Sequence, residues 1–147
     1  MIKVLVAYFA IIVNVAFAQR QYRISNINTQ TFLQTAVAPG EPLTLGIIED
    51  SWTIDPPLGD GVTVSTIRDV QTGLYAGVDQ AVQDAKIIAV TDPYPFNIAL
   101  SSTGSYIIYP MTSDLYWDTN ATISPFIELV SESDIIGNDA SFKIELA

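Results

Sequence analysis

The sequence predicts an all-β domain made of three similar repeats, and two recurring patterns carry this prediction. Isoleucine stands before a turn at Ile24, Ile67 and Ile108, about every 42 residues, which is the period of an internal repeat. An aromatic residue, a polar residue and an isoleucine close each repeat: Trp52-Thr53-Ile54, Phe96-Asn97-Ile98 and Phe142-Lys143-Ile144. Four short strands in each of three repeats make the twelve-strand architecture called the β-trefoil.

The first repeat covers about residues 20–61. Its opening strand alternates apolar and polar residues, which puts Tyr22, Ile24 and Asn26 on one face. Proline and glycine break strand pairing, so the stretch APGEP at 38–42 must be a loop. Strands are expected from residue 22, at 32–37, at 43–48 and at 52–54.

The second and third repeats cover about 62–105 and 106–147. The second alternates Val62 and Val64 with polar residues before it turns, and the third has a longer loop at 131–141. Strands are expected from residues 62 and 74, at 86–90 and 96–98, from 106, around 116–117, and at 126–130 and 142–144. A seven-strand sandwich is the alternative fold, but it does not explain the matched closing triplets.

Superposing the three turns aligns further residues. The aligned sets are Ile27 with Val70 and Met111, Thr29 with Thr72 and Ser113, and Phe32 with Tyr75 and Tyr116. Because the same residue types recur at the same distance from each turn, we expect the three turns to have the same backbone path.

The N-terminal segment has the composition of a secretory signal peptide. A short basic start precedes an apolar run at 4–17, and Ala-Phe-Ala at 16–18 fits a cleavage site. The alternative is a membrane anchor, but spanning needs about 20 apolar residues and Asn14 interrupts the run. We therefore expect 1–18 to be a signal peptide and 19–147 to be one secreted β-trefoil domain.

Composition excludes several classes of function. The chain has no cysteine and no histidine, so it lacks the Ser-His and Cys-His pairs of common hydrolases and the usual zinc ligands. Its formal net charge of −10 opposes binding to nucleic acid and to anionic membranes. The acidic residues of the loop at 132–139 do not have the spacing of a calcium loop. We expect a monomeric binding protein, without catalytic residues, metal or cofactor.

The chain resembles small fungal β-trefoils, and most closely the cospin-like serine protease inhibitors. The resemblance rests on TGLYAG at 72–77, on Leu115-Tyr116-Trp117 and on the terminal triplet, and it extends over 19–147. It implies inhibition of a secreted serine protease through an exposed loop between the second and third strands. That loop is QTAVAPGEP at 34–42, and its candidate residues are Ala36, Val37, Ala38 and Pro39.

The loop has no arginine or lysine, which argues against trypsin as the target. Val37 or Ala38 would suit an elastase-like or subtilisin-like enzyme with a small pocket, and Pro39 would stiffen the loop. The alternative interpretation is that Pro39 and Gly40 form an ordinary turn.

Ricin-B-type lectins are the second family that the chain resembles, more distantly. Their Gln-x-Trp mark is missing, because DSW, YPF and ASF stand at the three equivalent places. The best remaining carbohydrate site is Asp114, Trp117, Asp118 and Asn120, with carboxylates and an amide for sugar hydroxyls and an aromatic platform. Trp117 is alternatively a core residue. Asn120 also begins a glycosylation sequon. A third hypothesis is a defence or virulence effector that keeps only the scaffold.

Overall fold

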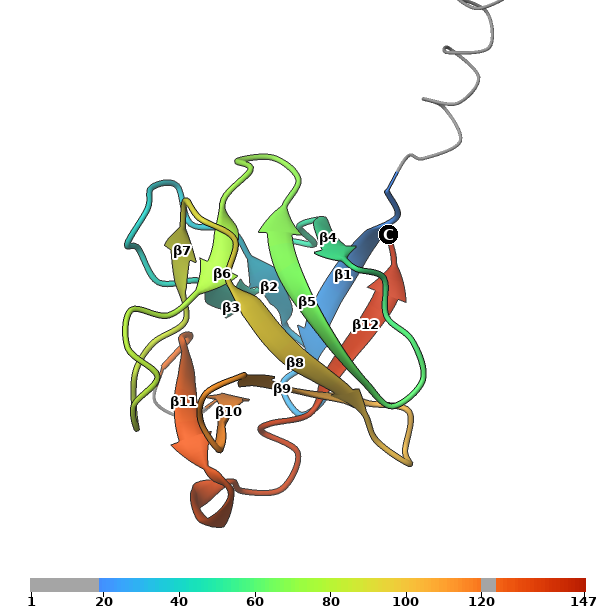
Figure 1. Cartoon of the computed structure of the whole chain (residues 1–147), viewed down its shortest axis with the longest axis vertical. Coiled ribbons are helices and arrows are strands. Elements are labelled where there is room, and N and C mark those ends of the chain that lie inside the picture. The colour runs from blue at the N-terminus through green and yellow to red at the C-terminus, as the bar shows by residue number, and fades with distance from the viewer. Residues whose placement is uncertain (1–18, 120–123) are drawn as a thin grey trace, which may run out of the picture.

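The computed structural model describes residues 19–119 and 124–147. The predicted signal peptide and the Asn120 sequon lie outside the described residues. The structure confirms the all-β prediction (Figure 1). Its strands are β1 (Gln21–Asn26), β2 (Phe32–Gln34), β3 (Thr44–Gly46), β4 (Trp52–Asp55), β5 (Val62–Asp69), β6 (Tyr75–Gly77), β7 (Ile88–Val90), β8 (Pro95–Leu100), β9 (Tyr106–Pro110), β10 (Leu115–Thr119), β11 (Ile127–Ser131) and β12 (Phe142–Leu146), with a 3-10 turn η1 (Glu132–Asp134) after β11.

Six strands close into an antiparallel barrel. Going around the ring, β1 pairs with β4, β4 with β5, β5 with β8, β8 with β9, β9 with β12, and β12 with β1. Isoleucines of the sequence pattern lie opposite one another, for example Ile24 against Ile144 and Ile98 against Ile108. A closed ring leaves no unpaired strand edge, which suits a protein without disulfides.

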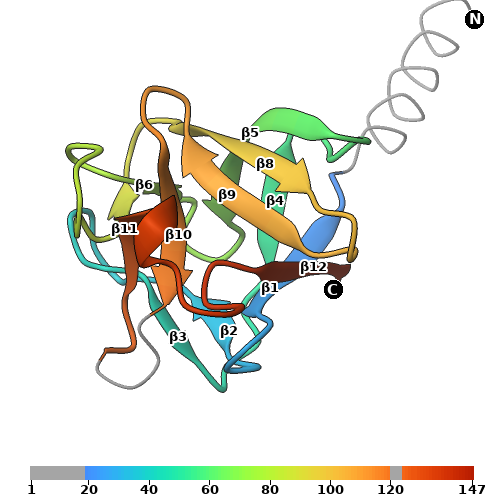
Figure 2. The ribbon, with the colours of Figure 1, turned by 90° about the horizontal axis from the view of Figure 1, so that it is seen from below.

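The other six strands form three hairpins, β2–β3, β6–β7 and β10–β11, that gather on one side of the barrel (Figures 1 and 2). The hairpins are joined by backbone hydrogen bonds. Leu43 N donates to Ile87 O at 3.0 Å, and Ile87 N donates to Ile127 O at 2.9 Å. Each repeat therefore supplies four strands, and the arrangement is the predicted β-trefoil.

The core is built from the residues that recur. Ile24, Ile67 and Ile108 are fully buried. The aromatic residues of the closing triplets, Trp52, Phe96 and Phe142, are fully buried as well. Burying one such side chain stabilises a fold by about 1.5–3 kcal/mol, so these layers stabilise a domain that has no disulfides.

One expectation from the sequence is wrong in detail. β2 and β3 are three residues each, shorter than expected, because the chain leaves the ladder at Thr35, whose N–H donates instead to Asp50 Oδ2 at 2.7 Å. The aligned residues Val70 and Met111 are exposed, whereas Ile27 is half-buried. No helix in residues 19–119 and 124–147 is long and apolar enough to cross a membrane.

Candidate functional site

The loop between β2 and β3 presents one apolar side chain to solvent. Val37 is 86% exposed, whereas the neighbouring Ala36 is only 5% exposed and anchors the loop in the core. Ala38 is half-buried and Pro39 is exposed. Of the four predicted inhibitory residues, Val37 and Pro39 are therefore the exposed ones.

The same loop is held at both ends. Thr35 N donates to the Asp50 carboxylate, and Gly40 N donates to Ala89 O at 2.8 Å in the neighbouring repeat. Glu41 N donates to Ala38 O at 3.3 Å across a turn in which Gly40 has φ of +87°. Pro followed by a positive-φ glycine is typical of a type II turn. The turn expected as the alternative is thus present, and it fixes the loop beside an exposed Val37.

The aromatic platform predicted for sugar binding is not available. Trp117 is 0% exposed, and its ring makes edge contacts with Phe96 at 5.1 Å and Phe142 at 5.9 Å. A sugar stacks on an exposed aromatic face, but the ring of Trp117 is packed inside the core. Asp114 is exposed on the turn before β10, and Asn120 lies outside the described residues. Trp117 is therefore a core residue, and Asp118 is the remaining candidate of the predicted carbohydrate site.

Asp118 is a buried carboxyl group beside two other carboxyl groups. It is 7% exposed, and its Oδ1 has no hydrogen-bond partner in the part of the chain that the structure describes. Burial, together with the negative charges of Asp139 and Glu128, raises the pKa of Asp118 from 3.8 to about 6. A buried, unpartnered carboxyl with a raised pKa is typical of functional sites, although structural networks can produce it too.

Three segments distant in the sequence meet around Asp118. Glu128 lies opposite Asp118 in the β10–β11 ladder. Asp139, in the loop before β12, accepts a hydrogen bond at 2.7 Å from Asn28 Nδ2, and its carbonyl accepts from Thr119 N at 3.1 Å. We call Asp118, Glu128, Asp139 and Asn28 the Asp118 site. Sequence reasoning missed Glu128, which strand pairing places opposite Asp118, and Asn28, which joins the site through its hydrogen bond to Asp139.

The Asp118 site offers acceptors and one amide. Within residues 19–119 and 124–147, no group of three or more acidic side chains is arranged to hold a metal ion. At neutral pH a carboxyl with a pKa of about 6 is mostly ionised, so it accepts hydrogen bonds. Such a set can bind hydroxyl groups of a neutral ligand.

A second polar hollow lies between the first two repeats and was not predicted. This cleft has a volume of about 280 Å³ and is lined by Gln21, Glu49, Asp50, Ser51, Asp69, Val70 and Gln71. We call it the Asp69 cleft. It combines the loop before β4 with the turn after β5, because Trp52 and Asp69 are partners in the β4–β5 ladder.

No protein-family model matches the chain, and no curated protein sequence matches it. Solved structures do match. The chain is similar to the ricin B-like lectin of Macrolepiota procera in complex with lactose, with a TM-score of 0.72, 16% identity, and coverage of 88% of this chain and 97% of the lectin. It is also similar to the Rhizoctonia solani agglutinin, with a TM-score of 0.73, 15% identity, and coverage of 89% and 97%.

A designed threefold-symmetric protein, ThreeFoil, matches with a TM-score of 0.66 and 13% identity, over 84% of this chain and 96% of the design. These matches confirm the β-trefoil fold. At such identities they carry nothing finer than the fold, because one fold supports many functions. Nothing in the three matches supports the resemblance to cospin-like inhibitors.

Proposed function

We propose that this protein binds carbohydrate, through the Asp118 site. The observation that carries the proposal is the buried Oδ1 of Asp118, which has no hydrogen-bond partner in the described part of the chain. A buried acceptor without a donor costs about 1–3 kcal/mol, and a ligand hydroxyl can supply that donor. The chain also shares its fold with two lectins, one of them solved in complex with lactose, and this analogy supports carbohydrate binding.

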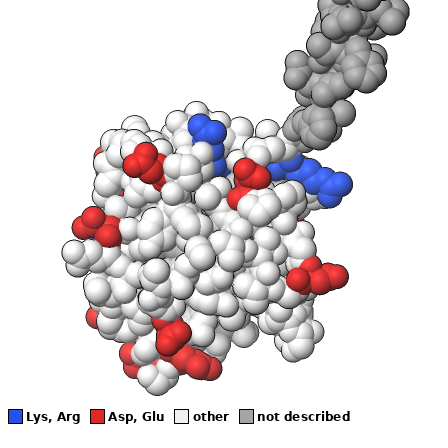
Figure 3. All heavy atoms as spheres, in the orientation of Figure 1, with Lys and Arg blue, Asp and Glu red and all other residues white. Residues whose placement is uncertain are grey.

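The negative charge of the Asp118 site limits which sugars can bind there. Asp118, Glu128 and Asp139 are all carboxylates, and acidic side chains are spread over the surface with few basic ones between them (Figure 3). Sialic and uronic acids would be repelled by such a field. We therefore expect a saccharide without acidic groups, whose hydroxyls donate to the carboxylates.

A glycan array with residues 19–147 tests the proposal. We expect the wild-type chain to bind neutral glycans and Asp118→Asn to lose binding at least tenfold, since the amide replaces a charged acceptor. Asp92→Asn is the matched control, because Asp92 is exposed in the loop between β7 and β8. An array without hits, or equal binding by Asp118→Asn, would contradict the proposal.

Inhibition of a serine protease is the second candidate function. It is favoured by one observation, the 86% exposure of Val37 on a loop held by Thr35 and Gly40. Holding a loop before binding removes part of the entropy cost of association. A panel of trypsin-, chymotrypsin-, elastase- and subtilisin-type enzymes tests it, and a flat panel with a folded chain would exclude a general role of this kind.

Secretion is also a proposal. Residues 1–18 have the basic start, apolar run and small-residue site of a signal peptide. Expression of the full chain in a eukaryotic host, followed by mass spectrometry of the medium, should give an N-terminus at Gln19. The same spectra would report whether Asn120 carries a glycan.

A further inference from the structure

Asn26 and Asp69 occupy the same position in the first and second repeats. Asn26 lies opposite Phe142 and Asp69 opposite Trp52, the aromatic residues of two closing triplets. Backbone hydrogen bonds match atom for atom. Asn26 N donates to Thr31 O at 3.0 Å, and Asp69 N donates to Leu74 O at 2.8 Å.

One end of each side chain caps the turn that follows. Asn26 Oδ1 accepts from Thr29 N at 3.1 Å, and Asp69 Oδ2 accepts from Thr72 N at 2.8 Å. The hydroxyl of Thr72 also donates to Asp69 Oδ2, at 2.6 Å. These bonds account for one carboxylate oxygen of Asp69.

The other ends of the two side chains differ. Asn26 Nδ2 donates to Asp139 O at 2.9 Å and to Ser141 O at 3.2 Å. The Asp69 side has the same backbone frame, because Val70 N donates to Ser51 O just as Ile27 N donates to Ser141 O. Asp69 is 2% exposed, and its Oδ1 finds no hydrogen-bond partner in the described ranges.

An acceptor therefore stands in the second repeat where the first repeat has a donor. The loop residues equivalent to Asp139 and Ser141 are Glu49 and Ser51, and both line the Asp69 cleft. A carboxylate oxygen directed toward that loop needs a donor between it and the loop acceptors. The cleft is where such a donor can enter.

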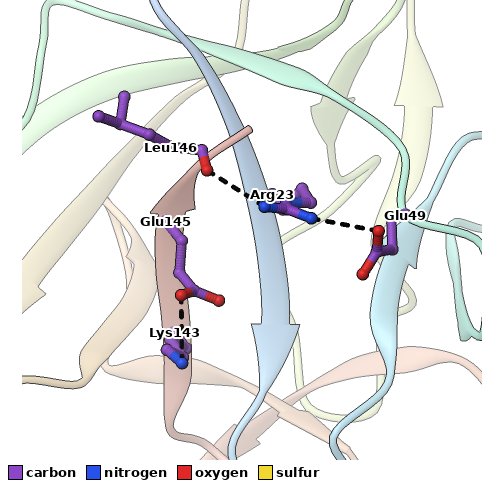
Figure 4. Close-up of polar contacts among 5 residues, drawn as sticks. All are labelled: Arg23, Glu49, Lys143, Glu145 and Leu146. Carbon is purple, nitrogen blue, oxygen red and sulfur yellow. Dashed lines mark hydrogen bonds and ion pairs between the residues drawn. The ribbon is translucent and has the colours of Figure 1, made fainter.

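The charges around the cleft favour a cation. Glu49, Asp50 and Asp69 are carboxylates in its lining, and Gln21 and Gln71 add amides. Arg23 contacts Glu49 at 3.1 Å but is not itself part of the lining (Figure 4). Asp50 Oδ2 already accepts from Thr35 N, which fixes that carboxylate. The cleft thus has an excess of acceptors and of negative charge.

We propose that the Asp69 cleft binds a primary ammonium group on a small hydroxylated ligand, as in a 2-amino-2-deoxy sugar. An ammonium group carries three donors, which suit Asp69 Oδ1 and the acceptors of the Glu49–Ser51 loop. The amides of Gln21 and Gln71 are left for ring hydroxyls. This is a second ligand site, and it does not depend on the Asp118 site.

NMR titration of ¹⁵N-labelled 19–147 with glucosamine tests the proposal. We expect shifts of the Ser51, Val70 and Gln71 amides, and shifts at least tenfold smaller at equal concentration with N-acetylglucosamine, which has the same hydroxyls and no charge. Asp69→Asn should weaken glucosamine binding at least tenfold, and Glu49→Gln should weaken it as well. Asp60→Asn, an exposed residue of the loop between β4 and β5, should leave it unchanged.

The outcomes separate this site from the proposed carbohydrate function. Asp69→Asn should fold, because asparagine already stands at the equivalent position of the first repeat, Asn26. Unchanged glucosamine binding by Asp69→Asn overturns the proposal, as does equal binding of N-acetylglucosamine. Shifts of the same amides by calcium chloride, with none by glucosamine, would make the cleft a metal site and also overturn it. Asp118→Asn should leave these shifts intact.

Discussion

Asp118 and Glu128 face each other in the β10–β11 ladder, so two carboxyl groups lie on one side of the hairpin. Directly opposed side chains in a sheet are about 5 Å apart at Cβ, and like charges there are destabilising. Burial is the main cause of the raised pKa of Asp118, and the negative charges of Asp139 and Glu128 contribute to it. The arrangement weakens the fold locally and leaves Asp118 Oδ1 without a hydrogen-bond donor among the described residues.

This relationship predicts a pH dependence of stability. The pKa of Asp118 is raised from 3.8 to about 6, so between these values the folded state binds more protons than the unfolded state. The free energy of unfolding therefore falls as pH rises through this window, by at most about 3 kcal/mol. Urea unfolding from pH 4 to pH 7.5 measures it.

Asp118→Asn separates this effect from the general repulsion in an acidic protein. The variant cannot ionise at that position, so its advantage over wild type should grow as pH rises from 4 to 7. Parallel pH profiles for the two proteins would show that Asp118 titrates normally.

Asn26→Asp tests the amide group of Asn26, which bonds the loop before β12, while an oxygen acceptor for the turn cap remains. The change removes two hydrogen bonds from Nδ2 to Asp139 O and Ser141 O and puts a charged acceptor beside two carbonyls. We expect a loss of at least about 2 kcal/mol in the free energy of unfolding. Asp69→Asn is the reciprocal control and should be neutral or stabilising, so a loss of similar size in both variants would refute the comparison.

The two tryptophans should respond differently to replacement by phenylalanine. Trp52 Nε1 donates to Leu33 O at 3.1 Å, whereas Trp117 Nε1 is buried with no acceptor among the residues described. Trp52→Phe loses a hydrogen bond that Trp117→Phe does not have to lose. We expect the cost in unfolding free energy to be about 1–2 kcal/mol greater for Trp52→Phe, and chemical denaturation followed by far-UV circular dichroism measures it. Equal costs would argue against this assignment.

Val37→Arg tests the exposed loop. Because Val37 is 86% exposed, the free energy of unfolding should change by no more than about 0.5 kcal/mol. If the loop enters a protease cleft, the arginine should give inhibition of trypsin that the wild type lacks. Ala36→Arg is the contrast, since Ala36 is 5% exposed and a buried arginine should unfold the domain. Inhibition that stays unchanged for every protease in the panel would remove this loop from consideration.

Much of the fold could be predicted because short-range sequence patterns specify its strands and its core. The isoleucines before the turns and the aromatic residues of the closing triplets are the buried layers of the barrel. Strand ends were less predictable. The sequence favoured strands at 32–37 and 43–48, but the Asp50 carboxylate captures Thr35 N and ends β2 early, a contact between residues fifteen positions apart.

The candidate site was predictable only in part. Sequence analysis predicted Asp118 as a site residue, but it grouped Asp118 with Trp117 and Asp114, which are near it in the chain. Because side chains alternate along a strand, Trp117 points into the core. The pairing of β10 with β11 places Glu128 opposite Asp118. Neither fact is visible without knowing which strands meet.

The sequence specifies the threefold β-trefoil, because period, alternation and turn chemistry act over a few residues and repeat. It also determined the acidic charge and the absence of cysteine and histidine. Which acceptors lack donors depends instead on contacts between segments that are distant in the sequence. Asn26 and Asp69 have similar shapes and cap similar turns, but the carbonyls brought in by a distant loop satisfy the amide of Asn26 and leave Asp69 Oδ1 unpartnered among the described residues.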